Sequence, residues 1–486
     1  MPNPFLPLTE YIPDGEPHVF GDRVYLYGSH DSENGKRFCE RDYVVYSARV
    51  DDLQNWICHG VSYRKSQDPR SRGDKLVDYY APDCVQGNDG RYYLYYVAMG
   101  PNTRNFGPIS VAVSDKPEGP FDYLGDIQNR DGSPMLKYLT NDPAVINDNG
   151  KIFLYYGWGL GRDFRSKILS PIYDIVQSKI FSRSLGEIKT TKPSILSSAV
   201  VELEEDMLTV KHEPRAVLHS KTTADKNSVL YQHAFYEAPS IRKFGGTYYL
   251  IYSSGQNNEL CYATSQSPDR DYEYRGILIS NSDLGYQGYR QRLAPAGTIH
   301  GSVERINGDY YVFYHRCTHN TDFSRQACAE RIRMNPDGTF EQAEITTQGM
   351  GKPLSARGKI LASLCCNLYN KKTKKVQGNG HEQDQPNINH DQNGQYITAI
   401  DNGTVIGYKY IVFHRVKKLS VITRKAKGKF IVTTQPGGKI SAVIDLERGD
   451  TWQKVESELT VPDGIQALYF TYIGRGKIDF REFEIL

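Results

Sequence analysis

The sequence predicts an all-β protein, with a five-bladed β-propeller over residues 1–345 and a jelly-roll-like β-sandwich over residues 346–486. Three observations lead to this prediction. The composition is rich in Tyr (36) and Gly (43), which suits many short strands joined by turns. One strand signal returns five times before residue 320. A different pattern of short alternating segments begins at residue 396.

The repeated signal is a two-residue turn containing Gly, followed by an aromatic and β-branched strand. Its five copies are GDRVYLYG from Gly21, DGRYYLYY from Asp89, NGKIFLYY from Asn149, GGTYYLIY from Gly245 and NGDYYVFY from Asn307. Superposing the turns gives spacings of 68, 60, 96 and 62 residues. Each spacing suits a four-stranded sheet with its loops, and a ring of five such sheets is a propeller. The alternative of five unrelated hairpins does not explain the regular return.

The longest spacing and the last third of the chain depart from this pattern. The 96-residue gap predicts an insertion around residues 161–195. The propeller pattern stops near Glu341, and a polar stretch from Asn370 predicts an exposed loop. From Tyr396, alternating segments with Gly or charged turns about every ten residues indicate a β-sandwich.

Charge and hydropathy restrict the partners. Lys plus Arg (59) nearly balances Asp plus Glu (57), which argues against nucleic acid as a partner. No run approaches the roughly 18 apolar residues of a membrane helix, so no membrane partner is expected. The N-terminal MPNPFLPLTEYIPDG has no basic region before an apolar stretch. A cytoplasmic location is therefore expected, and export stays open if a signal sequence has been removed. The sequence does not address the oligomeric state.

The eight cysteines are scattered and contain no CxxC pair. This spacing argues against a zinc site. In a chain of 486 residues, such cysteines are expected to be buried free thiols and not a disulfide framework.

The peptides before the repeats carry the candidate chemistry. They are YIPDGEPHVF, YYAPDCVQ, YLTNDPAVI, FYEAPSIRK and GTIHGSVER. The innermost strand of each blade should lie here, so a polar residue at the same place in several blades would point into the axial cavity. The candidates are Asp14, Asp83, Asp142, Glu237 and His300. Three carboxyls in one cavity suit glycosidic bond cleavage, which needs an acid for the leaving oxygen and a base for water.

These five motifs, in this order, resemble glycoside hydrolase family 43 over roughly residues 3–345. The resemblance implies a five-bladed propeller and an inverting mechanism. It implies an exo-glycosidase that removes α-L-arabinofuranosyl or β-D-xylosyl units from plant polysaccharides or oligosaccharides. Two alternatives stay open: an exo-acting galactan- or arabinan-degrading enzyme of the same fold, and a non-catalytic carbohydrate-binding propeller.

The resemblance also implies roles for the three carboxyls. Asp14 corresponds to the general base, Asp142 to the carboxylate that orients the acid and tunes its pKa, and Glu237 to the general acid. The first motif departs from the family, which usually has Asp-Pro where this chain has Asp14-Gly15-Glu16-Pro17. Counting back from the following turn favours Asp14 as the base, whereas matching the Pro favours Glu16.

Four further residues are candidates for substrate or metal contacts. His300 resembles the axial His that many family members place beside a calcium ion, so a structural Ca²⁺ is one expectation and a hydrogen-bonded core His is the other. No cofactor is expected to be required. His30 and Asp31 follow the first hairpin and are expected to line the mouth of the pocket. Trp158 follows the third hairpin and is expected to stack on a sugar ring.

The C-terminal segments resemble, more loosely, a family 6 carbohydrate-binding module. The order GGKISAVIDLERGDTWQKVESELTVPDGIQALYFTYIG carries this resemblance. Trp452 is the only Trp of the module. Sugar binding and a purely buttressing role are both left open.

Overall fold

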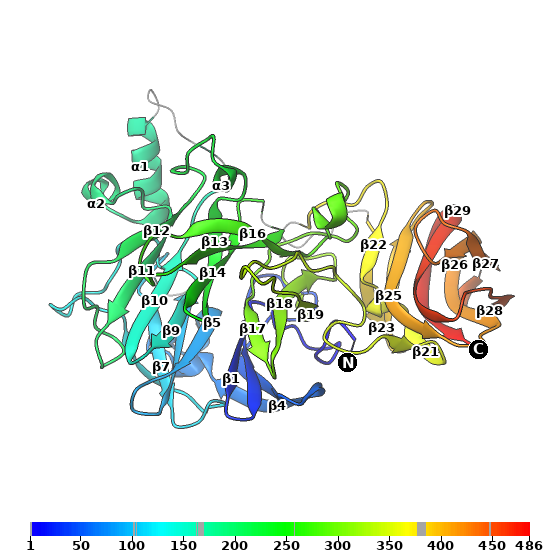
Figure 1. The fold of residues 1–486 in the computed structure, drawn as a ribbon, viewed down its shortest axis with the longest axis horizontal. Helices are drawn as coiled ribbons and strands as arrows, with labels where there is room; N and C mark the ends of the chain where they lie inside the picture. The colour runs from blue at the N-terminus through cyan, green and yellow to red at the C-terminus, as the bar shows by residue number, and fades with distance from the viewer. Residues whose placement is uncertain are drawn as a thin grey trace.

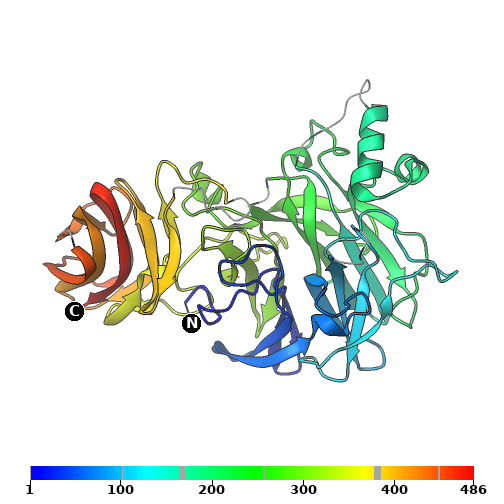
Figure 2. The same ribbon diagram turned by 180° about the vertical axis from the view of Figure 1, so that it is seen from behind.

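The structure is a computed structural model that describes residues 2–100, 103, 105–161, 163, 170–256, 258–376, 385–446 and 449–486. Strands dominate it, as predicted. Figure 1 shows a propeller, coloured blue to green, beside a smaller β-rich module, coloured yellow to red. Figure 2 shows the same two parts from behind. Within the described residues, no helix is long and apolar enough to cross a membrane.

Five antiparallel sheets form the blades, which confirms the predicted propeller. Blades one and two contain β1 (Glu16–Phe20), β2 (Arg23–Tyr27), β3 (Tyr43–Arg49), β4 (Asp52–Tyr63), β5 (Asp78–Gln86), β6 (Tyr92–Met99), β7 (Ser110–Ser114) and β8 (Asp122–Asp126). Blades three and four contain β9 (Ala144–Asp148), β10 (Lys151–Gly157), β11 (Ser197–Leu203), β12 (Arg215–His219), β13 (Phe235–Phe244), β14 (Thr247–Ser254), β15 (Glu259–Ser265) and β16 (Glu273–Ser280). Blade five contains β17 (Val303–Ile306), β18 (Asp309–Cys317) and β19 (Arg325–Ile332).

The repeated turns join the first two strands of each blade, as the sequence predicts. In the third and fifth blades both turn residues, Asn149-Gly150 and Asn307-Gly308, have positive φ. This is the type I′ geometry, whose twist matches that of the flanking strands.

Five separate clusters of buried side chains lie between neighbouring blades and close the ring. Leu26, Leu94, Leu154, Leu250 and Val312, which superpose in the repeats, are all buried in them. Apolar burial between every pair of neighbouring blades therefore holds the ring together.

Blade five differs from the prediction of four strands in every blade. It has three strands, and the N-terminal segment runs along β19. The Phe5 amide donates to the Ala327 carbonyl (3.2 Å), and the Ala329 amide donates to Asn3 Oδ1 (3.0 Å). The N-terminal segment thus joins the last blade to the first without forming a regular strand.

The predicted insertion lies between β10 and β11 and is helical. It contains α1 (Ser170–Phe181) and α2 (Leu185–Thr190), which lie beside blade three in Figure 1. Residues 162 and 164–169 of the predicted range lie outside the described residues. A short helix, α3 (Val229–Gln232), precedes β13.

The C-terminal module contains one continuous hydrophobic core between its strands, consistent with the predicted β-sandwich. The long strands β26 and β29 pair with each other, and most other strands pair with one of them. The strands are β20 (Leu354–Ser355), β21 (Gly358–Leu361), β22 (Asn367–Tyr369), β23 (Asn387–Asp391), β24 (Gly394–Ile400), β25 (Val405–Phe413), β26 (Lys418–Thr433), β27 (Ile440–Leu446), β28 (Gly449–Glu458) and β29 (Gly464–Ile485).

All eight cysteines are free thiols, and all except Cys58 are buried, which confirms the prediction from their spacing.

Candidate active site

In four blades a backbone kink, just before the innermost strand or within its first residues, sets the positions of the candidate residues. Asp14, Ala81, Asp142 and Ala238 all have positive φ (58°, 34°, 48° and 60°), and each is followed by Gly or Pro. Non-glycine residues seldom adopt this conformation, and its recurrence marks one structural position in four blades. In this register Glu237 lies one residue earlier. The expectation that all five candidates occupy one position is therefore wrong for Glu237 and for Asp83.

A cavity of about 250 Å³ lies at the end of the innermost strands. Asp14, Asp142, Glu237, Trp158 and His300 all line it. The structure thus brings together the three candidate carboxyls with two of the four other candidate residues. The wall also contains residues that the sequence did not single out, among them Phe38, Tyr80, Met99, Phe106, Tyr236 and Arg325.

Asp14 is a buried carboxyl that stays ionised. Arg325 Nη1 donates to Asp14 Oδ1 at 2.9 Å. Burial is the strongest single influence and would raise the pKa of Asp14, but the charge of Arg325, together with the nearby His315 and His300, outweighs it and leaves this pKa below its usual value. Burial and Arg325 lower the pKa of neighbouring His315 to about 3, so its neutral ring accepts the Asp14 amide at Nδ1 (3.2 Å). This environment suits a base.

Glu237 has the opposite environment. Burial and the nearby Asp142 raise the pKa of Glu237 to about 8, so it is protonated at neutral pH. Trp158 Nε1 donates to Glu237 Oε2 at 3.1 Å. Stacking of the indole on a sugar stays a prediction, and the structure shows that the indole contacts the most weakly acidic carboxyl of the pocket.

Asp142 lies between the other two carboxyls in acidity. Burial raises the pKa of Asp142 to about 6, against the attraction of His300. Its Oδ2 accepts the Ala238 amide at 2.9 Å, which ties Asp142 to the backbone next to Glu237. Asp142 therefore acts on Glu237 both through charge and through position.

His300 lies at the floor of the cavity, above Glu16. His300 Nδ1 is 3.9 Å from Asp14 Oδ1, and His300 Nε2 is 3.6 Å from Glu16 Oε1. Burial lowers the pKa of His300, but Glu16, Asp14 and Asp142 outweigh it and raise this pKa to about 9. Without a bound cation, His300 is therefore an imidazolium between carboxylates.

Beneath the cavity, a belt of charged residues links the innermost strands. Arg242 Nη2 donates to Glu16 Oε2 (3.0 Å), and Arg242 Nε donates to Glu304 (3.1 Å). Asp83 bonds to His18 (2.6 Å) and accepts the Val145 amide (2.7 Å). Glu16 and Asp83 belong to this belt and do not line the cavity, so Asp14 and not Glu16 presents a carboxylate to it.

His30 and Asp31 are not where the sequence led us to expect them. Among the described residues that line the cavity, neither is present. Buried His30 faces Glu10 and the Asp42 carbonyl. Asp31 accepts Arg325 Nε at 2.8 Å and Nη2 at 3.0 Å, so it holds the arginine that contacts Asp14. The turn after the first hairpin folds behind the pocket wall, and the expectation of direct substrate contact is wrong.

Arg325 is the main residue that sequence reasoning missed. It is the first residue of β19, in a segment without the turn and acid signals of the other motifs. The signal that could have identified Arg325 was its charge at the start of a strand whose other residues are mostly buried.

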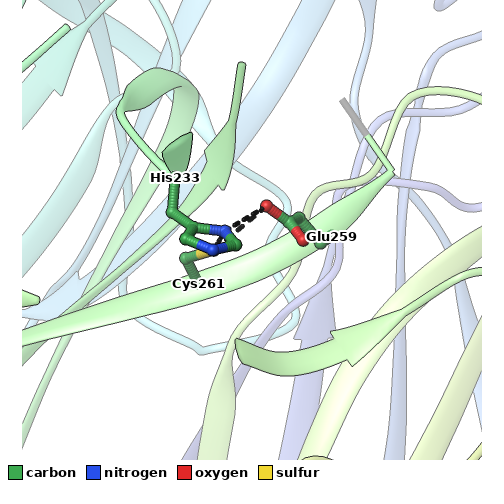
Figure 3. Close-up of side chains that lie close together, drawn as sticks. All are labelled: His233, Glu259 and Cys261. Carbon is green, nitrogen blue, oxygen red and sulfur yellow. Dashed lines mark hydrogen bonds and ion pairs between the residues drawn. The ribbon is translucent and has the colours of Figure 1, made fainter. Parts of the chain in front are cut away.

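A cluster of potential metal ligands lies outside the pocket, at His233, Glu259 and Cys261 (Figure 3). Glu259 Oε1 accepts hydrogen bonds from His233 Nδ1 (2.8 Å) and Ser254 Oγ (2.5 Å), and Cys261 Sγ lies 3.7 Å away. Burial raises the pKa of the Cys261 thiol well above its usual range. Hydrogen bonding accounts for this cluster without a metal.

A propeller that holds an ionised and a protonated carboxyl in one axial pocket has the equipment of a glycoside hydrolase. The family model for glycosyl hydrolases of family 43 matches residues 1–180 and 181–340. The chain therefore belongs to glycosyl hydrolase family 43 and is a glycoside hydrolase, as the motif order indicated.

Individual relatives agree with this assignment. A "Xylosidase/arabinosidase" of Thermoclostridium stercorarium is 37% identical in an alignment of 507 positions. The alignment covers 99% of this chain and 98% of that protein. A family 43 enzyme of Xanthomonas citri complexed with xylose is 26% identical, with a TM-score of 0.54 over 71% of this chain and 93% of that one. A β-xylosidase/α-arabinofuranosidase from a compost metagenome, with xylotriose and in a calcium-free form, is also 26% identical. Its TM-score is 0.52 over 70% of this chain and 97% of that one.

Proposed function

We propose that this enzyme is an inverting exo-glycosidase that removes α-L-arabinofuranosyl or β-D-xylosyl units from plant polysaccharides or oligosaccharides. The observation that carries the proposal is the unequal charge of the pocket carboxyls. Arg325 keeps Asp14 ionised, whereas burial and Asp142 keep Glu237 protonated. The name of the Thermoclostridium relative and the xylose and xylotriose complexes support the choice of sugars. A cavity of about 250 Å³ suits one terminal sugar.

The chemistry follows from these charge states. Glu237 gives its proton to the glycosidic oxygen while the bond from that oxygen to the anomeric carbon breaks. Asp14 takes a proton from a water molecule, whose oxygen forms the new bond to the anomeric carbon from the opposite face. The product has inverted configuration, and a proton must pass from Asp14 back to Glu237 before the next cycle. Asp142 holds the acid in place and keeps its pKa high.

The axial His300 suits a structural cation. Glu16 Oε1 and His300 Nε2 are buried, face each other, and have no hydrogen-bond partner among the described residues. Glu16 would hold Ca²⁺ directly, with His300 beside it, and the ion would supply positive charge under the pocket. Arg242 Nη2 donates to the other Glu16 oxygen, and the proposed proton transfers run between Glu237, Asp14 and water.

The C-terminal module buttresses the propeller in this proposal. Arg424 and Arg481 lie 4.2 and 5.0 Å from the centre of the Trp452 ring, so protein cations already occupy the space beside the ring. Tyr396 packs on the same indole. These contacts favour the buttressing alternative over sugar binding.

Hydrolysis of aryl glycosides tests the proposal. The panel contains α-L-arabinofuranoside, β-D-xylopyranoside and β-D-galactopyranoside, and proton NMR identifies the first-formed anomer of the released sugar. We expect release from the arabinoside or xyloside with inversion, and at least a 100-fold loss of kcat/KM in Glu237→Ala on substrates with poor leaving groups.

Glu330→Gln is the matched control, because Glu330 is also a buried carboxyl with a pKa raised by burial to about 8 but lies outside the pocket. Unchanged activity in Glu237→Ala would contradict the proposal. Release of galactose alone would favour the galactan-degrading alternative. No release from any glycoside would favour a non-catalytic propeller.

A further inference from the structure

The inserted helices build a small hydrophobic core beside the pocket. Phe181, the last residue of α1, is 3% exposed and belongs to this core. It does not line the cavity. The other buried members are Leu139, Ile188, Ile195 and Leu196. This core anchors the insertion next to the pocket, and Phe181 itself does not reach the cavity where substrate would bind.

Three aromatic rings surround the Trp158 indole. The ring centres of Phe106, Phe181 and Tyr236 lie 5.5, 5.7 and 5.8 Å from that of Trp158. Phe181 also packs edge-on against Phe106 at 5.6 Å. Such contacts restrict the rotation of a large planar side chain.

The backbone on both sides of the indole is fixed as well. The Gly159 amide donates to the Tyr236 carbonyl, next to Glu237. Arg183, which follows α1, donates to the Phe106 carbonyl, and Thr140 Oγ1 donates to the same oxygen at 2.8 Å. The insertion therefore reaches Trp158 through Phe181 directly and through Phe106.

The indole N–H has a single direction in which to donate, and it donates to Glu237 Oε2. Because Glu237 Oε2 accepts this N–H, it cannot also direct the carboxyl proton toward Trp158 Nε1. The N–H contact therefore favours the proton of Glu237 on Oε1, the oxygen that would then protonate the glycosidic oxygen.

We propose that Phe181 is a positioning residue for the general acid, because the inserted helices hold Trp158 where its N–H fixes Glu237 with the proton on Oε1. This inference rests on the proposed function, since it requires Glu237 to be the acid. It assigns the insertion between β10 and β11 a part in proton transfer, in addition to its position beside the pocket.

Leaving-group dependence separates this role from a merely structural one. Phe181→Leu and Trp158→Phe are compared with wild type on a disaccharide and on a dinitrophenyl glycoside of the same sugar. Only the disaccharide needs full protonation of its leaving oxygen. Misplacing the acid should lower kcat/KM about tenfold for the disaccharide in Phe181→Leu and about twofold or less for the dinitrophenyl glycoside.

The pH profile is a second readout. The indole N–H favours ionised Glu237, so its loss should raise the pKa of Glu237 and move the alkaline limb of kcat/KM to higher pH. The other ionisable groups that face Glu237 are Asp142, His300, Asp14 and Tyr236, and neither substitution changes them.

The double variant tests whether Phe181 acts through Trp158. In the Trp158→Phe background, Phe181→Leu should cause no further loss on the disaccharide and no further shift of the alkaline limb. Phe340→Leu is the control, because Phe340 is a buried ring in an aromatic cluster with Tyr249, Tyr262 and Tyr310, away from the pocket. It should change neither the leaving-group dependence nor the pH limb.

Equal losses on both substrates in Phe181→Leu, or additive effects in the double variant, would overturn the inference. Glu237→Ala distinguishes this failure from failure of the proposed function. If Glu237→Ala abolishes cleavage of the disaccharide but Phe181→Leu does not, only the inference fails. If Glu237→Ala is fully active, the proposed function fails first.

Discussion

Asp14 and Glu237 are buried carboxyls of the same pocket, and their neighbours give them opposite charges. A guanidinium contacts Asp14, whereas an indole and a second carboxyl lie beside Glu237. Burial raises the pKa of both groups, and only at Asp14 do the neighbouring positive charges, Arg325 foremost, together reverse the effect. Each residue is suited to its proposed task by its neighbours and not by its type.

Substitution of Asp142 tests this account at the level of one charge. Asp142 raises the pKa of Glu237, so Asp142→Asn should lower that pKa. The alkaline limb of kcat/KM, which reports ionisation of the acid at a pKa of about 8, should then move to lower pH. The profile is measured from pH 4 to 10. An unchanged or raised limb would show that Asp142 does not act on Glu237 through charge.

Glu330 lies outside the pocket, so its effect on the pH dependence of stability can be tested without changing the active site. Burial raises the pKa of Glu330 from 4.5 to about 8, and Asn3, Tyr314 and Thr346 donate to its carboxyl. The folded state keeps a proton that the unfolded state loses between these values. The contribution of Glu330 to the free energy of unfolding is therefore full below pH 4.5 and is lost as pH rises toward 8.

In Glu330→Gln, the decline in unfolding free energy between pH 5 and 8 should be smaller than in wild type, although Glu237 still contributes to the same trend. Urea denaturation at several pH values measures it. Glu341→Gln, at an exposed position, is the control and should keep the wild-type slope. A wild-type slope in Glu330→Gln would show that Glu330 is already ionised in the folded protein.

At the scale of elements, a backbone kink before or within the innermost strand of four blades sets the positions of the candidate residues. The sequence predicted which peptides carry the candidate residues but neither the kink nor its register. Four blades use a residue with positive φ, whereas neither His300 nor Gly301 of the fifth blade has one. A Cβ on Gly301 would lie 2.0 Å from the Phe313 carbonyl oxygen, so only glycine fits between these strands.

Gly301→Ala should therefore displace His300 and strain the fifth blade. We expect destabilisation of about 1–3 kcal/mol and a marked loss of activity. Thermal unfolding and kcat/KM measure the two effects. Gly246→Ala is the control, because a Cβ there meets no atom within 4 Å. Wild-type stability in Gly301→Ala would mean that the strands separate more easily than their packing indicates.

The insertion shows what local pattern predicts at this scale. The 96-residue spacing located it, since an interrupted repeat is visible in sequence alone. Its contact with Trp158 was not predictable, because it depends on how the end of α1 packs beside blade three, which local pattern does not contain.

At the scale of the whole molecule, the module and the propeller share buried charges. Lys409 of β25 is 2% exposed and contacts Glu344 (2.8 Å) and Asp283 (3.2 Å) of the propeller part. Arg316 of β18 donates to the carbonyls of Cys365 and Cys366 at 3.2 and 3.1 Å. These contacts fasten the two parts to each other.

Lys409→Met should leave the carboxylates of Asp283 and Glu344 without their cation. Removing one partner of a buried ion pair costs about 3–5 kcal/mol, so we expect a large loss of stability. Chemical denaturation followed by tryptophan fluorescence measures it. Lys418→Met, on the exposed side of β26, should change stability by less than about 0.5 kcal/mol. Equal stability of the two variants would contradict a role for Lys409 in joining the parts.

The sequence by itself determined the propeller, its five repeats, the site of the insertion and the three carboxyls of the pocket. These follow from local signals, namely turn residues, strand periodicity and acids beside Pro or Gly, which act over a few residues. Only the tertiary structure decided the rest. Asp31 lies behind the pocket, Arg325 contacts Asp14, and Trp158 bonds Glu237, because these pairs come together through the closed ring from residues distant in sequence. The charge of a buried group depends on such neighbours, and a local pattern does not contain them.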